Sequence, residues 1–142
     1  MKIILDTNIY FSAFGFNGKM LSLVRHLFEN DSYQIFLCEE IYSEIKEKLI
    51  GAKFQKLTKN KFSVDFLNKL STQICKNSEI IQINNTITIC RDPKDNKFLE
   101  LAKEASANYI ITGDEDLLIL KEFEQTKILT PSKFIEELKL EL

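Results

Sequence analysis

Acidic side chains stand directly after two apolar segments of the chain. Asp6 ends the run Lys2–Leu5, and Asp114 follows the run Tyr109–Thr112 after one intervening glycine. Carboxylate oxygens are the ligands that hard divalent cations such as Mg²⁺ and Mn²⁺ prefer. Several carboxylates in one cleft repel one another and raise their own pKa values unless a cation is present. If both runs are neighbouring parallel strands, these acids meet at one sheet edge and indicate a divalent-cation site.

Further acids could join the same edge. Asp92 and Asp95 open a helical pattern, and Asp116 lies two residues beyond Asp114. Glu44 lies on another predicted helix, next to an apolar stripe. Two cations held about 3.5–4 Å apart can activate a water and stabilise the leaving oxygen of a phosphodiester. An acidic set of this kind is therefore typical of phosphodiester hydrolysis.

Some of these acids have ordinary structural alternatives. Asp92 could simply be an N-cap, and Asp95 could simply favour the positive end of its helix. Asp114 or Asp116 could cap the short helix that follows them, and Glu44 could be an ordinary solvated charge on its helix. Asp6 is different, because a carboxylate at the inner end of an apolar strand is costly to bury unless something pairs with it. The prediction of a functional site depends most on Asp6.

Apolar runs and helical spacings alternate along the chain. Continuous apolar runs predict strands, and apolar residues repeating every three or four positions predict helices. The predicted strands are 2–5, 33–37, 79–83, 109–112 and 127–129, and the predicted helices are 19–29, 39–50, one or two within 54–76, 92–107, 116–122 and one that begins at Thr130-Pro131. This alternation predicts a mostly parallel sheet with helices on both faces. The role of the segment 51–60 stays open.

Length and composition bound the class of protein. With 142 residues, the chain is expected to form one domain over residues 1–142. Three widely spaced cysteines and a single histidine, His26, argue against a zinc site and a Ser–His–Asp triad. No apolar stretch nears the roughly 20 residues of a membrane helix, so we expect a soluble, cytoplasmic protein with no membrane contact. A net charge of −2 argues against bulk coating of nucleic acid but does not exclude a nuclease.

Four features, in their order and spacing, resemble those of the PIN-domain ribonucleases. They are the run Ile3-Ile4-Leu5-Asp6-Thr7-Asn8, the isolated Glu44, the segment DPKDNKFLELA at 92–102 and the segment ITGDEDLL at 111–118. The resemblance is greatest to the VapC-like toxins of prokaryotic toxin–antitoxin pairs. It implies a three-layer α/β/α fold around a central, mostly parallel sheet of four to five strands. It also implies a Mg²⁺- or Mn²⁺-dependent endoribonuclease that cuts single-stranded RNA.

The resemblance assigns roles to individual residues. The catalytic acids are Asp6, Glu44, Asp95 and Asp114, the residues that orient them are Asn8 and Thr112, and the auxiliary candidates are Asp92 and Asp116. Asp6, Asp95 and Asp114 are expected to hold the metal directly. Glu44 is expected to be either a further ligand or the holder of the attacking water. No acidic position of the family pattern is missing, so the resemblance does not indicate a catalytically inactive enzyme.

The resemblance also implies partners and products. A homodimer and a small protein antitoxin that covers the cleft are expected, as are 5′-phosphate and 3′-hydroxyl product ends. Basic residues around the cleft are expected to attract the RNA, and they are Lys19, Arg91, Lys94 and Lys97. Their small number predicts a modest dependence of RNA binding on salt.

Two alternatives belong to other classes of protein. A catalytically silent PIN-like module would bind RNA or protein and leave RNA uncut. A phosphatase or receiver-like domain would also place an aspartate after the first strand. The former would require a second acid where Asn8 stands, and the latter a phosphorylatable aspartate where Ile83-Asn84-Asn85 offers none.

Overall fold

The computed structural model describes residues 1–142, and strands and helices alternate along the chain. The strands are β1 (Lys2–Leu5), β2 (Gln34–Leu37), β3 (Ser78–Ile80), β4 (Tyr109–Ile111), β5 (Glu122–Phe123) and β6 (Thr126–Leu129). The helices are α1 (Thr7–Gly15), α2 (Gly18–Glu29), α3 (Glu39–Ile50), α4 (Ala52–Leu57), α5 (Val64–Lys76), the 3₁₀ turn η1 (Pro93–Asp95), α6 (Asn96–Ala105), α7 (Glu115–Leu118) and α8 (Pro131–Glu137). None of the α-helices is both long and apolar enough to cross a lipid bilayer.

One sheet runs through the molecule in the strand order β3-β2-β1-β4-β6-β5. All neighbouring strands are parallel except β5, which pairs antiparallel with β6. Leu5 is opposite Ile111, which is in turn opposite Leu129, so the carboxyl ends of β1, β4 and β6 lie level. The chain leaves β1 toward β2 on one side and returns to β4 on the other. Ligands of open α/β sheets bind at such a switch in strand order.

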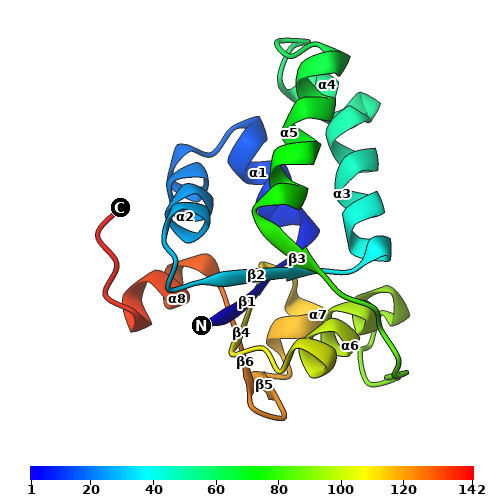
Figure 1. Ribbon diagram of the computed structural model, residues 1–142, viewed down its shortest axis with the longest axis vertical. Coiled ribbons are helices and arrows are strands. Elements are labelled where there is room, and N and C mark those ends of the chain that lie inside the picture. The colour runs from blue at the N-terminus through cyan, green and yellow to red at the C-terminus, as the bar shows by residue number, and fades with distance from the viewer.

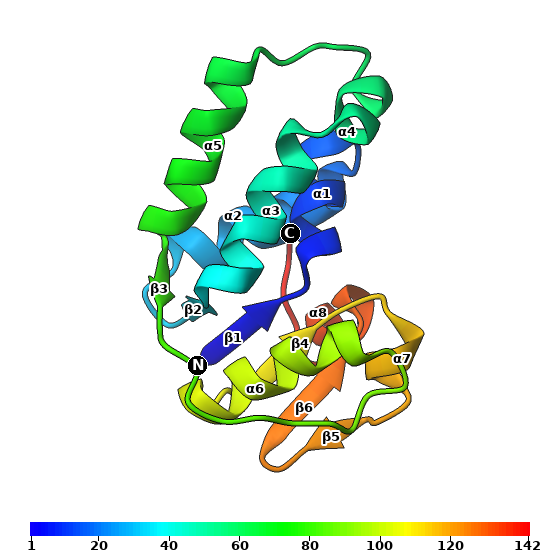
Figure 2. The same cartoon turned by 90° about the vertical axis from the view of Figure 1, so that its right-hand side faces the viewer.

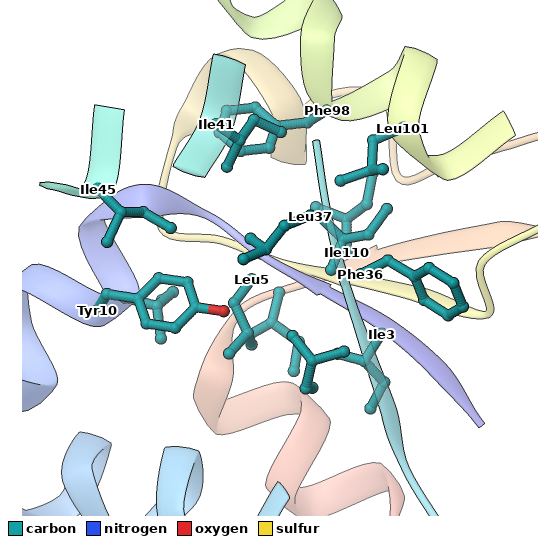
Figure 3. Close-up of a cluster of buried hydrophobic side chains, with 14 of the residues drawn as sticks. Ile3, Leu5, Tyr10, Phe36, Leu37, Ile41, Ile45, Phe98, Leu101 and Ile110 are labelled. Atoms are coloured by element: carbon teal, nitrogen blue, oxygen red, sulfur yellow. The ribbon is translucent and has the colours of Figure 1, made fainter. Parts of the chain in front are cut away.

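Helices cover both faces of the sheet and complete the three-layer α/β/α arrangement that was predicted (Figures 1 and 2). Ile41 of α3 and Phe98 of α6 lie over one face, and Tyr10 of α1 lies near Leu5 on the other, where α2 and α8 also pack (Figure 3). The central strands are continuous apolar runs because both of their faces are covered. Ile4 is fully buried, as are its neighbours in β1 and β4.

Three helices project away from this sheet. α3, α4 and α5 form a protrusion on one side of the molecule, with α4 at its far end (Figures 1 and 2). α5 packs along α3, and α4 packs against both α3 and α1. The ring of Phe54 is fully buried at this junction. The segment 51–60, whose role the sequence did not predict, thus forms α4 and the turn that follows it.

The structure departs from the sequence patterns in a few places. The patterns do not predict α1, because seven of its nine residues are apolar or aromatic or small and no polar face marks the helical period. The predicted helix 92–107 begins as a 3₁₀ turn and ends at Ala105, where Ser106 takes a left-handed φ of 52°. The sheet has six strands because the two-residue β5 adds an edge beside β6. The predicted strand 79–83 ends at Ile80.

Candidate active site

Asp6 lies at the carboxyl end of β1 and is only 5% exposed. Its backbone N–H donates to the carbonyl of Ile111 on β4 at 3.0 Å. Its Oδ2 accepts a 2.6 Å hydrogen bond from the Thr112 hydroxyl, and its Oδ1 accepts a long one, 3.5 Å, from the Asn8 backbone N–H, at the start of α1. The Asn8 side chain turns to Lys48, whose ammonium donates to it at 3.1 Å. The buried carboxylate therefore has the pairing that its position requires.

A chain of hydrogen bonds continues from Thr112 along the end of β4. The Thr112 hydroxyl accepts from the Asp114 backbone N–H at 3.0 Å, and Oδ1 of Asp114 accepts from the Asp116 N–H at 2.9 Å. Asp114 is thus the N-cap of α7, and the idea that Asp116 caps this helix is wrong. Asp116 lies inside α7, and its carboxylate accepts from Nε of Arg91 at 2.7 Å.

Asp92 and Asp95 come from the turn that begins α6. Asp92 is the N-cap of η1, with its Oδ1 accepting from the Lys94 N–H at 3.0 Å, so its structural alternative is confirmed. Asp95 makes no cap hydrogen bond for α6. It is 8% exposed, and its Oδ2 is buried without any hydrogen-bond partner. A buried carboxylate oxygen without a partner is unusual and needs a donor or a cation.

A cavity of about 360 Å³ brings most of these residues together at the carboxyl ends of β1 and β4. Its lining residues are Asp6, Asn8, Glu44, Lys48, Asp92, Lys94, Asp95, Lys97, Phe98 and Asp114. The residues that were predicted from four separate parts of the chain thus share one hollow. Carboxylate oxygens of Asp92, Asp95 and Asp116 also lie within 4.8 Å of one another. The auxiliary candidates therefore approach Asp95 from two different elements, Asp92 from the start of η1 and Asp116 from α7.

Two carboxyls in this cavity, Asp95 and Asp6, have raised pKa values. Burial raises the pKa of Asp95 to about 7, together with the adjacent Asp114 carboxyl and the negative charges of Asp92 and Asp6. Burial also raises the pKa of Asp6, although the hydrogen bonds from Thr112 and Asn8 oppose that rise. Asp95 and Asp6 hold protons more tightly because they are buried and because negative charges surround them.

Glu44 shows the opposite behaviour. Burial alone would raise its pKa, but the Lys97 and Lys48 ammonium groups hold it below its usual range. Oε2 of Glu44 is bonded to Nζ of Lys97, and Oε1 lies 3.3 Å from Nζ of Lys48. Glu44 is therefore ionised and fixed in position on the wall of the cavity.

The donor set fits a divalent cation. Every acid that lines the cavity offers carboxylate oxygens, and neither histidine nor cysteine is among the lining residues. Hard cations such as Mg²⁺ and Mn²⁺ take such ligands. The partnerless Oδ2 of Asp95 and its neighbouring carboxylates are the features that a bound cation would satisfy.

Two of the basic residues that were expected to attract RNA are already engaged. Lys97 is bonded to Glu44, and Arg91 is bonded to Asp116. Lys94 is exposed at the rim of the cavity, and Lys19 is exposed at the start of α2. The carboxylate partners of Lys97 and Arg91 neutralise their charges, so these two residues hold acids in place and are not free to attract RNA.

The sequence patterns did not predict two residues of α6, Asn96 and Glu100, whose side chains hold the backbone of the segment before Asp92. Oδ1 of Asn96 accepts from the N–H groups of Ile89 and Cys90, at 3.1 and 2.9 Å. Glu100 likewise accepts from the Ile87 N–H at 3.0 Å. These bonds tie the strandless segment 81–91 along α6, and that segment leads into Asp92 (Figure 2). A buried polar residue on the apolar side of a predicted helix was the available signal.

A comparison with protein families identifies the fold. A family model described as a PIN domain matches residues 2–116 of the chain. The chain belongs to the PIN domain family. PIN domains are typically nucleases that use divalent metals, and the matched residues include every acid of the cavity. The stretch beyond the match supplies β6, which pairs with β4 in the same sheet.

One relative extends the similarity over almost the entire chain. The uncharacterized protein MJ1680 of Methanocaldococcus jannaschii is 34% identical over 149 residues. The alignment covers 96% of this chain and 91% of the relative.

Proposed function

We propose that this PIN domain is a metal-dependent endoribonuclease that cleaves single-stranded RNA. The observation that carries the proposal is Asp95, a buried carboxylate with a partnerless oxygen, which faces Asp6, Asp92 and Asp114 across one cavity. A purely structural cluster would have resolved this repulsion with lysines or arginines. Here the lysines neutralise only Glu44, and Asp6, Asp92, Asp95 and Asp114 make no ion pair.

Asp6, Asp95 and Asp114 are the residues that would hold Mg²⁺ or Mn²⁺, with Asp92 and Asp116 as auxiliary ligands. When bound, such a cation lowers the pKa of a water molecule and neutralises charge on the leaving oxygen of a phosphodiester. The chemistry needs no histidine, which agrees with the lack of any histidine in the cavity lining.

The chain's own residues orient this chemistry. Thr112 fixes the Asp6 rotamer through the 2.6 Å bond to Oδ2, whereas Oδ1 accepts only the long 3.5 Å bond from the Asn8 N–H. Glu44, ionised and held by two lysines, would hold the water that attacks phosphorus by accepting a hydrogen bond from it. Asn8 positions Lys48 at 3.1 Å, beside Glu44. Groups that fix ligands in this way typically change activity by about 10–100-fold when they are lost.

The biological setting is a further part of the proposal. The VapC-like sequence pattern supports a role as the toxin of a toxin–antitoxin pair, acting on RNA in the cytoplasm. A small protein antitoxin that covers the acidic cavity and a homodimer of the toxin complete this account. The expected products carry 5′-phosphate and 3′-hydroxyl ends.

A cleavage assay with matched variants tests the nuclease. Purified protein is incubated with a mixed single-stranded RNA in Mn²⁺, Mg²⁺ or EDTA, and Asp6→Asn is carried through the same purification. The proposal expects cutting in either metal, none in EDTA and none by the variant. Asp31→Asn, which changes an exposed acid before β2, serves as the charge-matched control and should cut like the wild type.

The same assay separates the alternative. If the folded wild type binds RNA with Mg²⁺ and leaves it intact under every metal condition, the chain is a silent binding module. Controlled expression tests the toxin role, because the wild type should arrest growth and Asp6→Asn should not.

A further inference from the structure

The segment 48–64 is the most basic part of the chain. It carries five lysines and none of the protein's 21 acidic residues. It forms the end of α3, the whole of α4 and the loop that leads to α5, at the far end of the protrusion (Figures 1 and 2). We name residues 48–64 the basic tip. In a chain with a net charge of −2, this clustering creates one strongly electropositive surface.

The lysines of the basic tip differ from the basic residues at the acidic cavity. The exposed tip lysines without an ion pair are Lys53, Lys56, Lys59 and Lys61. At the cavity, Lys97 and Arg91 are each neutralised by a carboxylate. Only charges without an internal partner are fully available to the phosphates of a ligand. The tip therefore offers the positive charge that the engaged residues at the cavity cannot.

A second hollow connects the basic tip with the acidic cavity. It has a volume of about 290 Å³ and is lined by Asn8, Phe11, Lys48, Gly51, Ala52 and Lys53. Asn8 and Lys48 also line the acidic cavity. The two hollows thus meet at this hydrogen-bonded pair, and an extended ligand can run from the carboxylates to the tip along one continuous surface.

Phe11 gives the second hollow an aromatic wall. Its ring is half-buried and packs edge-on against Phe54, with centroids 5.3 Å apart. The Lys53 ammonium lies 5.8 Å from the Phe11 centroid, and the 64% exposed ring of Phe16 lies 6.4 Å away. Sites for single-stranded nucleic acids combine aromatic rings, on which bases stack, with cations that contact the phosphates. An unpaired base is needed for such stacking, so the hollow favours a single strand over a duplex.

We propose that this second hollow binds a nucleotide next to the cleaved bond, with its base on Phe11 and its phosphate at Lys53. The remaining tip lysines, Lys56, Lys59 and Lys61, contact the following phosphates of the same strand. The position of the cleaved bond rests on the proposed nuclease, whereas the binding of RNA at the basic tip does not require cleavage.

A charge-matched pair of variants tests the basic tip. The tip variant combines K53Q, K56Q, K59Q and K61Q, and the control variant combines K103Q, K121Q, K133Q and K139Q, four exposed lysines elsewhere that make no ion pair. Both lose four positive charges. All proteins also carry Asp6→Asn so that binding is measured without cleavage. The probe is a 12-nucleotide single-stranded RNA with a fluorescent end, followed by anisotropy from 50 to 300 mM KCl, with circular dichroism to confirm folding.

The proposal expects the tip variant to bind roughly 10- to 100-fold more weakly than its parent. Its slope of log Kd against log salt should fall by as much as about 3, since each lost contact with a single strand removes about 0.7. The control variant should stay within about twofold of its parent. Phe11→Leu keeps apolar volume against Phe54 and removes the aromatic face, so it should weaken binding about 5- to 100-fold with the salt slope unchanged.

The outcomes separate this subsite from the nuclease. Equal losses in the tip and control variants would mean that bulk charge alone attracts RNA, and they would overturn the proposal. Unchanged binding by the tip variant would overturn it too and would leave the tip to an acidic protein partner. With the Asp6 side chain restored, normal RNA cleavage by the tip variant would contradict the subsite and uphold the nuclease. Tip-dependent binding of RNA that the wild type never cuts would uphold the subsite and contradict the nuclease.

Discussion

The Thr112 hydroxyl donates a 2.6 Å hydrogen bond to Oδ2 of Asp6, although 106 residues separate the two in the chain. The bond joins the carboxyl ends of β1 and β4, where the strand order switches. It is completely buried on the threonine side, with Thr112 0% exposed. A single hydroxyl therefore couples the backbone of β4 to the orientation of the central acid.

Thr112→Val should lower RNA cleavage by about 10–100-fold, because it removes the hydroxyl that fixes the Asp6 rotamer. Valine fills nearly the same volume as threonine, so the packing around this position is kept. Thr112→Ser should retain most of the activity. Thr126→Val is the matched control, since the Thr126 hydroxyl is equally buried but donates to the Ala107 carbonyl, away from the cavity. It should cost stability, about 1–2 kcal/mol, and leave the cleavage rate unchanged. A Thr112→Val enzyme with full activity would remove the positioning role of Thr112.

Stability without metal should depend on pH through Asp95. Its pKa is raised from 3.8 to about 7, so the folded protein binds this proton more tightly than the unfolded chain does. The free energy of unfolding in EDTA should therefore fall as the pH rises from 5 to 7.5, by about 1–2 kcal/mol after allowance for solvent screening. Urea denaturation at the two pH values measures this difference.

Asp95→Asn should remove most of that pH dependence and make the metal-free protein more stable at pH 7.5. Excess Mg²⁺ should also stabilise the wild type at pH 7.5, since a cation relieves the same repulsion. Asp65→Asn, on the exposed side of α5, should leave the wild-type dependence in place. If the stabilities of the wild type and Asp95→Asn respond identically to pH in EDTA, the pKa of Asp95 is not raised in the folded protein.

The pair of Glu44 and Lys97 should separate stability from catalysis. Glu44→Leu leaves the Lys97 ammonium, whose side chain is 14% exposed, without its carboxylate, so it should cost about 1–3 kcal/mol. Combining it with Lys97→Met removes both charges and should recover most of that loss. Cleavage should be lost in both variants, because the carboxylate that holds the attacking water is missing. Recovery of cleavage together with stability would show that Glu44 acts only as a structural partner.

Asn96 should matter to both the fold and the site. Its side chain accepts two backbone hydrogen bonds from the segment that leads to Asp92. Asn96→Ala leaves the N–H groups of Ile89 and Cys90 without that acceptor and should cost about 1–3 kcal/mol. Amide hydrogen exchange over residues 85–92 should become faster while exchange in β1 stays slow. Unchanged protection in this segment would mean that other contacts hold it.

The sequence patterns predicted the sheet and most helices because those elements carry clear periodicity. Ile41, Ile45 and Leu49 repeat along α3, and Thr130-Pro131 marks the start of α8, and both elements begin where the patterns place them. The patterns did not predict α1, because Ile9, Tyr10 and its other residues leave no polar face that would reveal a helical period. Periodicity detects half-exposed helices well and buried ones poorly.

Four acids of the cavity could be chosen from the sequence because Asp6 and Asp114 follow strands and Asp92 and Asp95 open a helix. Glu44 lies in the middle of α3 and was chosen through the resemblance to the PIN-domain ribonucleases. The pairing of the polar side chains around these acids could not be predicted from the sequence. Whether Lys97 faces RNA or Glu44 depends on the distance between α3 and α6, which are 53 residues apart at this contact. The support of Asp92 by Asn96 likewise depends on an irregular segment that has no sequence period. Long-range pairings of polar groups are set by packing, and local patterns do not encode them.

The most direct test of the central claim follows the fate of one water molecule. The wild type and Asp6→Asn are incubated with a defined single-stranded RNA and Mn²⁺ in water enriched in ¹⁸O, and the fragments are weighed by mass spectrometry. The account predicts internal cuts whose 5′-phosphates carry one ¹⁸O, made by the wild type alone and abolished by EDTA. Intact RNA, or 2′,3′-cyclic phosphates made equally by Asp6→Asn, would contradict water-dependent hydrolysis at this acidic site.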